Sequence, residues 1–202
     1  MKTACNVCAN HCMPEEGRTG LCRVRYNRGG QIKSNAYGKV TSVSLDPIEK
    51  KPLHYFYPGS RILSLGSYGC SFSCPFCQNY EISMAGEEEI LSGALPIRDL
   101  SPEFYRMVHG SLEDVKRFIV TAAGKSHVEV TTLVIPGLND SEEEIEELAR
   151  WLASIRPDIP LHLNRFFPRY RMTDREATNI ETLLRLADTA RGYLRFVKVG
   201  NC

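Results

Sequence analysis

The stretch SLGSYGCSFSCPFCQNYEIS, residues 64–83, places three thiols, Cys70, Cys74 and Cys77, in one short loop after an apolar strand candidate. A structural zinc site takes four ligands, and cubane iron–sulfur clusters held by protein alone usually take four cysteines. Three thiolates on one loop therefore predict a cluster or metal with one coordination position open to another molecule. A zinc loop completed by a distant residue is the alternative. Gly69 and Pro75 supply the bends that such a loop needs.

Four further thiols lie in an N-terminal segment rich in Gly and Arg, namely Cys5, Cys8, Cys12 and Cys22. A lobe of this size is too small to be stable on its own core, so the spacing predicts a metal that staples it. Zinc and an auxiliary iron–sulfur cluster are both compatible with the spacing, and His11 is an alternative ligand. Four unrelated free cysteines are the remaining interpretation.

The composition is that of a globular protein with one ordinary domain and a small appendage. The chain has 202 residues, 43% of them hydrophobic, and a net charge of +1, which does not favour a nucleic-acid partner. The basic segment RVRYNRGGQIK, residues 23–33, is better interpreted as a hairpin that turns at 27–30. No apolar run reaches membrane length and no secretory signal precedes the lobe, so we predict a cytoplasmic protein. Disulfides explain its eight cysteines poorly in that compartment.

Helix and strand patterns alternate after the cysteine loop. Ser111 begins a predicted helix whose buried face carries Val115, Phe118, Ile119 and Ala122. The capping box of Ser141 and Glu144 begins another, with Ile145, Leu148, Leu152 and Ile155 as its buried stripe. A third helix is expected near 174–190, capped by Thr173 and Glu176. Apolar segments at 61–69, 127–137, 159–168 and 194–201 are strand candidates. This order predicts an α/β fold with a parallel sheet. The predicted domains are 1–60, a Cys-rich lobe with an extended connector, and 61–202, a β/α core.

Chemistry in parallel sheets gathers at the carboxyl ends of the strands. The cysteine loop, PGLND at 136–140 and FPRYRM at 167–172 all follow strands, so we expect them to share one pocket. Asn139 and Asp140 stand at a helix start, where they either bind polar ligand groups or only cap the helix. Arg165 is a candidate for a ligand carboxylate, whereas His162 is more often structural.

Residues 70–77, CSFSCPFC, resemble the CxxxCxΦC motif of radical S-adenosylmethionine (SAM) enzymes, where Φ is aromatic. The resemblance extends to LDPIEKKPLHYFYPGS at 45–60, VEVTTLVIPGLNDS at 128–141 and LHLNRFFPRY at 161–170. Together these segments resemble the radical SAM enzymes of the AmmeMemoRadiSam system, which are related to pyruvate formate-lyase activating enzymes.

This resemblance implies a [4Fe–4S] cluster on the three loop cysteines, with SAM on its open iron and Phe76 against the adenine. Asn139, Asp140 and Arg165 would face SAM. The implied reaction is reductive cleavage of SAM to a 5′-deoxyadenosyl radical, which abstracts hydrogen from an unidentified substrate. A flavodoxin or ferredoxin would supply the electron. Two alternatives are an activase that makes a glycyl radical on a partner protein, and a noncatalytic iron–sulfur or zinc protein derived by internal deletion.

The chain is shorter than the resemblance leads us to expect. The core of these enzymes is a partial (β/α)6 barrel, yet only about 30 residues separate Tyr80 from Ser111, and each β/α unit needs roughly that many. The fold expected is therefore a truncated partial (β/α) barrel that lacks the piece from about the first helix to the fourth strand, and the C-terminal tail of relatives is also missing. A shortened barrel would expose strand edges, for which a homodimer that covers them, an open sheet and a nonfunctional truncated product are the alternatives.

Overall fold

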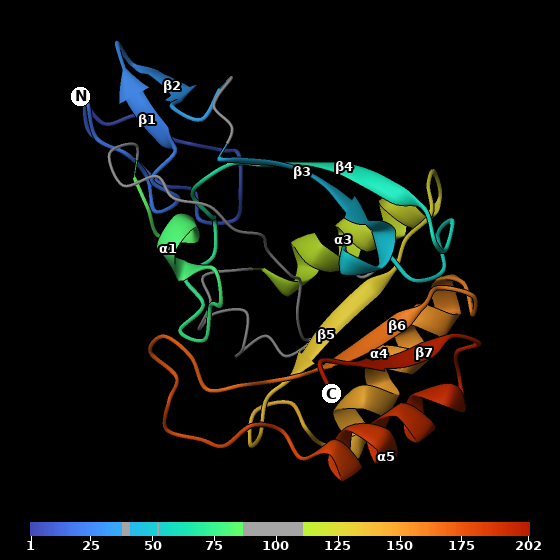
Figure 1. Ribbon diagram of the computed structural model, residues 1–202. Helices are drawn as coiled ribbons and strands as arrows, with labels where there is room; N and C mark the ends of the chain where they lie inside the picture. The colour runs from blue at the N-terminus through green and yellow to red at the C-terminus, as the bar shows by residue number, and fades with distance from the viewer. Residues whose placement is uncertain (38–40, 52, 87–110) are drawn as a thin grey trace.

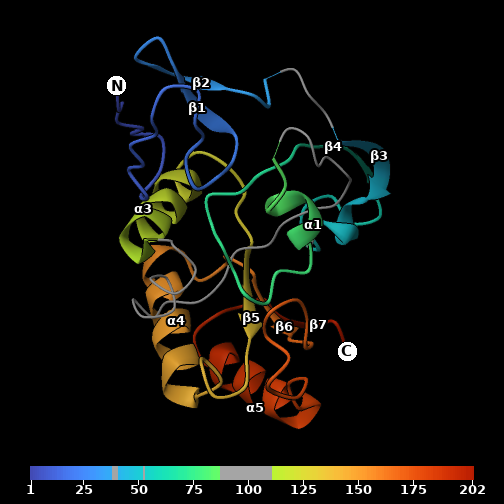
Figure 2. The same cartoon turned by 90° about the vertical axis from the view of Figure 1, so that its left-hand side faces the viewer.

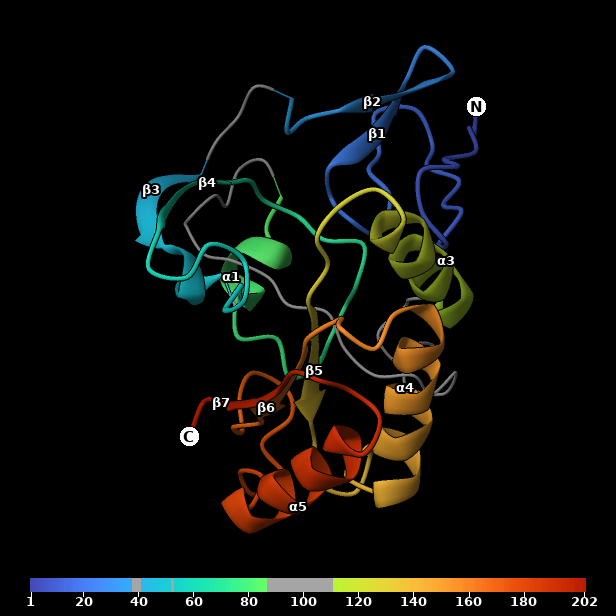
Figure 3. The ribbon, with the colours of Figure 1, turned by 90° about the vertical axis from the view of Figure 1, so that its right-hand side faces the viewer.

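The computed structural model describes residues 1–37, 41–51, 53–86 and 111–202. Its strands are β1 (Arg25–Arg28), β2 (Gln31–Ser34), β3 (Ser42–Pro47), β4 (Arg61–Gly66), β5 (Val130–Val134), β6 (Leu161–Arg165) and β7 (Val197–Gly200). Its helices are α1 (Tyr80–Ser83), α3 (Leu112–Ala123), α4 (Glu142–Ile155), α5 (Ile180–Arg191) and the 3-10 turn η1 (Ile48–Lys50). The N-terminal lobe with β1 and β2 lies at one end of the molecule and α5 at the other (Figures 1, 2 and 3).

The C-terminal half is built on a parallel sheet with the order β5-β6-β7. Its register aligns Val130 with Leu161 and Val197 on one face, and Thr131 with His162 and Lys198 on the other. Helices α4 and α5 follow β5 and β6 and pack on the first of these faces (Figures 1 and 3). The prediction of a parallel α/β arrangement is confirmed for this half.

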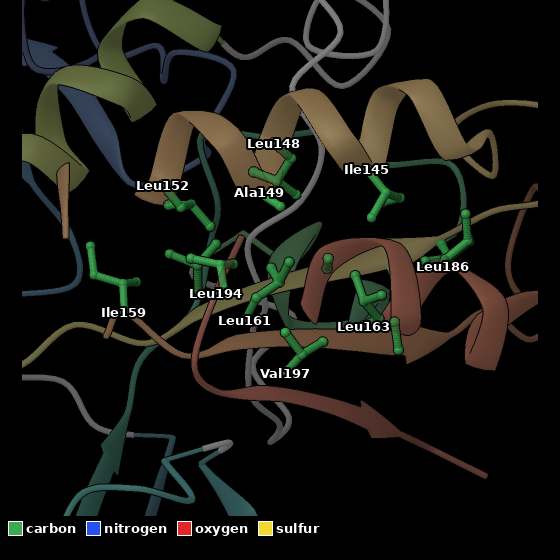
Figure 4. Packing of buried hydrophobic residues seen from close by; sticks show 14 of the residues in the cluster. Ile145, Leu148, Ala149, Leu152, Ile159, Leu161, Leu163, Leu186, Leu194 and Val197 are labelled. Carbon is green, nitrogen blue, oxygen red and sulfur yellow. The ribbon is translucent and has the colours of Figure 1, made fainter. Parts of the chain in front are cut away.

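The hydrophobic core lies between this sheet face and the two helices (Figure 4). The side chains that α4 contributes recur every three or four positions, which is the period of one helix face. Ile145, Leu148 and Leu152 were predicted on that face and are buried. The sheet and α5 contribute Leu161, Leu163, Leu183 and Leu186, all with 0% exposure.

Two of the three predicted helix starts are confirmed, and one was wrong. Ser141 accepts a hydrogen bond from the Glu144 N–H at 3.2 Å, which confirms it as the predicted cap. The Glu144 carboxylate turns back to the cap as predicted, but it accepts from the Ser141 hydroxyl, at 2.9 Å. The Ser111 cap of α3 is also confirmed. Helix α5 begins at Ile180 with Asn179 as its cap, so the predicted start near 174 was wrong.

The N-terminal lobe contains the predicted hairpin. Strands β1 and β2 pair in an antiparallel register that runs from Arg25 with Ser34 to Arg28 with Gln31. Gly29 and Gly30 turn the chain with φ of 62° and 72°, a conformation that glycine adopts without a steric cost.

Strand β4 does not join the parallel sheet, so the prediction that 61–69 is its first strand was wrong. Instead, β4 pairs antiparallel with β3 along its full length, in a two-stranded ribbon that lies across the predicted domain boundary at residue 60. One face of this ribbon exposes four aliphatic side chains, Val43, Leu45, Leu63 and Leu65. Among the described strands no closed barrel forms.

Helix α3 lies beside the N-terminal lobe in Figures 2 and 3. It buries Leu112, Ile119 and Ala123, whereas Phe118, predicted on its buried face, is 65% exposed. No helix in the described ranges has the length and apolar character to cross a membrane. The shortened stretch between Tyr80 and Ser111 lies mostly outside these ranges.

Candidate metal centre

The cysteine loop packs against the carboxyl ends of β5 and β6. Phe76 is 1% exposed and lies in an apolar cluster with Leu133 and Ile135 of the β5 segment, and Phe166 and Met172 after β6. Leu138 packs against the same cluster, as do Phe72 and Cys74 of the loop. The structure thus brings together the three segments for which the sequence predicted a shared site.

Direct contacts fasten this loop to the segment after β6. The Arg171 N–H donates to the Pro75 carbonyl at 2.8 Å. The rings of Tyr80 and Tyr170 stack with their centroids 4.4 Å apart. These contacts fix the backbone on both sides of Cys77, which is the support that a metal site needs from its surroundings.

The three thiols of the loop differ in exposure. Cys77 is buried and lies 3.2 Å from the Ser83 hydroxyl, whereas Cys70 and Cys74 are partly exposed. The Phe72 N–H donates to the Cys70 sulfur at 3.3 Å. Burial raises the pKa of Cys70 above its ordinary value, and the neighbouring Cys77 and Cys22 thiols raise it further. A bound cation would reverse this effect, because metal binding favours thiolates.

The N-terminal thiols surround a cavity of about 460 Å³. Its lining includes five sulfur-bearing side chains: Cys5, Cys8, Cys12, Cys22 and Cys70. The four predicted lobe ligands therefore line the same cavity, and the first cysteine of the loop lies at its wall.

Glycine allows the lobe and the loop to approach closely. Gly69 has φ of +77°, and a Cβ at this position would stand 2.2 Å from the Val24 Cγ2 and 2.5 Å from the Cys22 carbonyl. Nearby, the Asn10 amide donates to the Ser71 carbonyl at 2.7 Å. The cysteine loop is consequently docked on the lobe through backbone, with no side chain at Gly69 to separate them.

The candidate donor set consists of thiols, which suit zinc as well as an iron–sulfur cluster. In the parts of the chain that the structure describes, no three His, Cys, Asp or Glu side chains are grouped closely enough to hold one metal ion. The identity of the metal therefore stays a prediction.

A second cavity of about 630 Å³ lies between the lobe, the cysteine loop and α3. Val7 and His11 of the lobe, Phe72 of the loop, and Asp114 and Phe118 of α3 line it. It is the larger cavity beside the loop and has both apolar and polar walls, as binding sites for organic molecules do.

The residues predicted to face SAM have contacts of their own. Asn139 is buried, accepts from the Ile135 N–H at 2.7 Å and donates to the Leu133 carbonyl at 2.9 Å. Asp140 accepts from the Gly137 N–H at 2.9 Å. Both side chains bond to the backbone of β5 and of the turn after it, and Ser141, not either of them, caps α4. The interpretation of Asn139 and Asp140 as helix caps was therefore wrong, and their contact with SAM stays a prediction.

Arg165 and Phe76 also bond or pack within the protein. The Arg165 Nε donates to the Thr178 carbonyl at 2.7 Å, and its guanidinium lies 4.9 Å from the Phe167 ring centroid. Phe76 belongs to the apolar cluster described above. Their contact with SAM stays a prediction.

A buried polar network that the sequence did not reveal lies at the amino ends of the parallel strands. The Glu129 carboxylate is 1% exposed and accepts from the His162 Nε2 at 2.6 Å and the His127 Nε2 at 2.9 Å. It also accepts from the backbone N–H groups of His54 and Tyr55, at 3.1 and 3.0 Å. This network fastens residues 54–55 of the connector to the polar face of the sheet.

The protonation states in this network follow from its geometry. Lys198 Nζ donates to the His54 Nδ1 at 2.8 Å, which requires a neutral His54. Burial lowers the pKa of His162 and of His54, although the Glu129 charge opposes this. Burial alone would raise the pKa of Glu129, but the hydrogen bonds from His127, His162 and Tyr55 lower it. The network therefore holds the Glu129 carboxylate against His162, whose neutral form is favoured by burial.

The only sequence feature that pointed to this network is the position of two of its residues within their strands. His162 and Lys198 are each the second residue of their strand, and parallel pairing places them on one face. Glu129 and His54 are 75 residues apart, and no periodicity relates them.

Comparison with known proteins adds one relative and no function. No family model matches the chain. An uncharacterized protein of Methanocaldococcus jannaschii is 29% identical over 276 residues, which covers 99% of this chain and 81% of that protein. Since this chain has 202 residues, at least 74 of those positions (276 minus 202) have no counterpart in it. The chain is thus similar to a protein that carries additional residues inside the matched region.

Proposed function

We propose that this protein is a radical SAM enzyme with an internally shortened β/α barrel. The observation that carries the proposal is the loop with Cys70, Cys74 and Cys77, which the structure seats at the carboxyl ends of β5 and β6. That position is where ligands bind in parallel α/β proteins. Three thiols on such a loop leave one cluster position for SAM.

The loop residues would hold a [4Fe–4S] cluster, which when bound supplies the electron that cleaves SAM to methionine and a 5′-deoxyadenosyl radical. Phe76 and its apolar neighbours hold the loop backbone in place and keep water from its inner side. The Phe72 N–H and the Ser83 hydroxyl lie against the Cys70 and Cys77 sulfurs and stabilise their thiolates.

The substrate would enter the 630 Å³ cavity between the lobe, the loop and α3, because this cavity reaches Ser71 and Phe72 beside the first ligand. Its exposed wall residue Phe118 supports an organic substrate, including a side chain of a partner protein. An activase that makes a glycyl radical on a partner is the version of the proposal that uses a protein substrate.

A noncatalytic iron–sulfur protein is the second candidate. The relative from Methanocaldococcus jannaschii supports it, because that protein has at least 74 positions more in the matched region. If those positions include part of the SAM-binding wall, the cluster would remain without its substrate. Under this candidate the loop carries electrons or holds the fold together.

Anaerobic reconstitution with iron and sulfide, followed by dithionite and SAM, separates the two candidates. The enzyme should release 5′-deoxyadenosine, and Cys74→Ala should abolish both the release and the loop cluster. Cys202→Ala is the matched control, because Cys202 is exposed and lies outside both cysteine groups. A protein that forms the loop cluster yet releases no 5′-deoxyadenosine would leave only the noncatalytic candidate.

A further inference from the structure

The N-terminal lobe contains a second group of cysteines, and its surroundings indicate what it binds. Cys5, Cys8, Cys12 and Cys22 are all free thiols that line one cavity of about 460 Å³. The turn that carries the first three is closed by backbone bonds from the Cys5 N–H to the Cys12 carbonyl and from the His11 N–H to the Cys8 carbonyl.

Hydrogen-bond donors point at the sulfurs of the lobe. The Leu21 N–H donates to the Cys12 sulfur and the Arg25 N–H to the Cys22 sulfur, each at 3.4 Å. The Asn10 amide lies 3.7 Å from the Cys8 sulfur. Donors in these positions favour thiolates over thiols, and such bonds also adjust the potential of an iron–sulfur cluster.

The space around the sulfurs is kept open by glycine. A Cβ on Gly20 would stand 3.2 Å from the Cys12 sulfur and 3.1 Å from its Cβ. The volume of about 460 Å³ leaves room for a group larger than one ion, whereas zinc, which holds four sulfurs at about 2.3 Å, needs no such space.

We propose that Cys5, Cys8, Cys12 and Cys22 hold an iron–sulfur cluster in this cavity, separate from the group on the cysteine loop. Its four ligands come from the lobe alone, so the site does not depend on SAM or on the proposed reaction. Cys70 lines the same cavity, and Gly69 beside it lies against the Cys22 carbonyl. The lobe cluster therefore lies next to the loop, at the position from which a reduced flavodoxin or ferredoxin could pass one electron inward.

The test measures metal content in the full chain after anaerobic reconstitution. A loop variant with Cys70, Cys74 and Cys77 all changed to Ala should retain about four irons with equal sulfide, and the wild type about eight. After dithionite reduction, the loop variant should show the electron paramagnetic resonance signal of a reduced cluster. A lobe variant, Cys12→Ser with Cys22→Ser, should lose this signal.

Two results would overturn the proposal. One is a loop variant that binds about one zinc and no iron, and the other is a folded loop variant that binds neither metal. The lobe variant can fail to fold, because the lobe is too small to be stable on its own core. In that case the loop variant alone decides the question. A protein with about eight irons that does not cleave SAM would refute the proposed function and leave the lobe cluster intact.

Discussion

Replacing Gly69 by Ala tests whether the lobe and the cysteine loop are docked as the structure places them. The added Cβ would stand 2.2 Å from the Val24 Cγ2 and 2.5 Å from the Cys22 carbonyl, with φ at +77°. Two costs arise, one from the backbone conformation and one from the clash. The Val24 side chain can turn away, but the Cys22 carbonyl belongs to the backbone and cannot.

A matched control separates the two costs. Gly59 has φ of +78°, and a Cβ there would meet nothing within 4 Å. Gly59→Ala should therefore cost only the left-handed conformation, roughly 1–2 kcal/mol in the free energy of unfolding. Gly69→Ala adds overpacking, which typically costs about 1–3 kcal/mol more. That difference corresponds to a further decrease in Tm of about 2–12 °C for a chain of this length.

The assay is urea and thermal unfolding of both variants after anaerobic reconstitution, monitored by circular dichroism, because the lobe is expected to need its metal to fold. Adding Val24→Ala to Gly69→Ala should recover only part of the loss, because the contact with the Cys22 carbonyl remains. Equal destabilisation by Gly69→Ala and Gly59→Ala would show that lobe and loop are not in contact at this point, and would refute the docking.

Three further predictions concern the core, the polar network and the ribbon. Leu152→Ala should lower the free energy of unfolding by about 2–5 kcal/mol, measured in urea, whereas Leu184→Ala on the exposed side of α5 should cost far less. Lowering the pH below 6.5 should destabilise the fold, because unfolded histidines bind protons there and buried His162 does not. Below pH 4.5 protonation of the Glu129 carboxylate also lowers the free energy of unfolding. Glu129→Gln should therefore reduce the slope of this free energy against pH in that range. Finally, sedimentation should show a dimer that Leu63→Lys dissociates and Leu184→Lys does not, since the ribbon exposes an apolar face.

The sequence predicted well those elements whose cause is local. The Ser141 cap, the stripe on α4 and the hairpin at Gly29 and Gly30 each depend on residues close together in the chain. The parallel order β5-β6-β7 followed from short connections between strands and helices. These features needed no knowledge of distant contacts.

The failures arose where distant segments decide the structure. Strand β4 was predicted in the parallel sheet, but its partner β3 is joined to it through a proline-containing connector that hid the pairing. The start of α5 was misplaced because Thr173 and Asn179 are both good caps, and the buried Thr178 bonds to the Val134 carbonyl and fixes the chain before the helix.

The meeting of the three segments at the candidate site was predictable, whereas the roles of Cys70, Cys74 and Cys77 as ligands stay predictions. The pattern of strand ends indicated that the three loops lie together, and they do. The approach of the lobe to Gly69 and the polar network around Glu129 had no local signal. Gly69 meets residues of the N-terminal lobe, and Glu129 bonds to His162 and His54, 33 and 75 positions away.

The two faces of the parallel sheet differ in the substitutions that they tolerate during evolution. Substitutions on the helix-covered face must preserve volume, because Leu161 and Leu163 are fully enclosed. The opposite face presents Asn164 and Lys198 at its partly exposed positions, where a new side chain disturbs no helix packing. Substitutions that change binding specificity can therefore accumulate on this polar face while the helix-covered face maintains the fold. The buried Glu129 network is the part of the polar face where such substitutions are not tolerated.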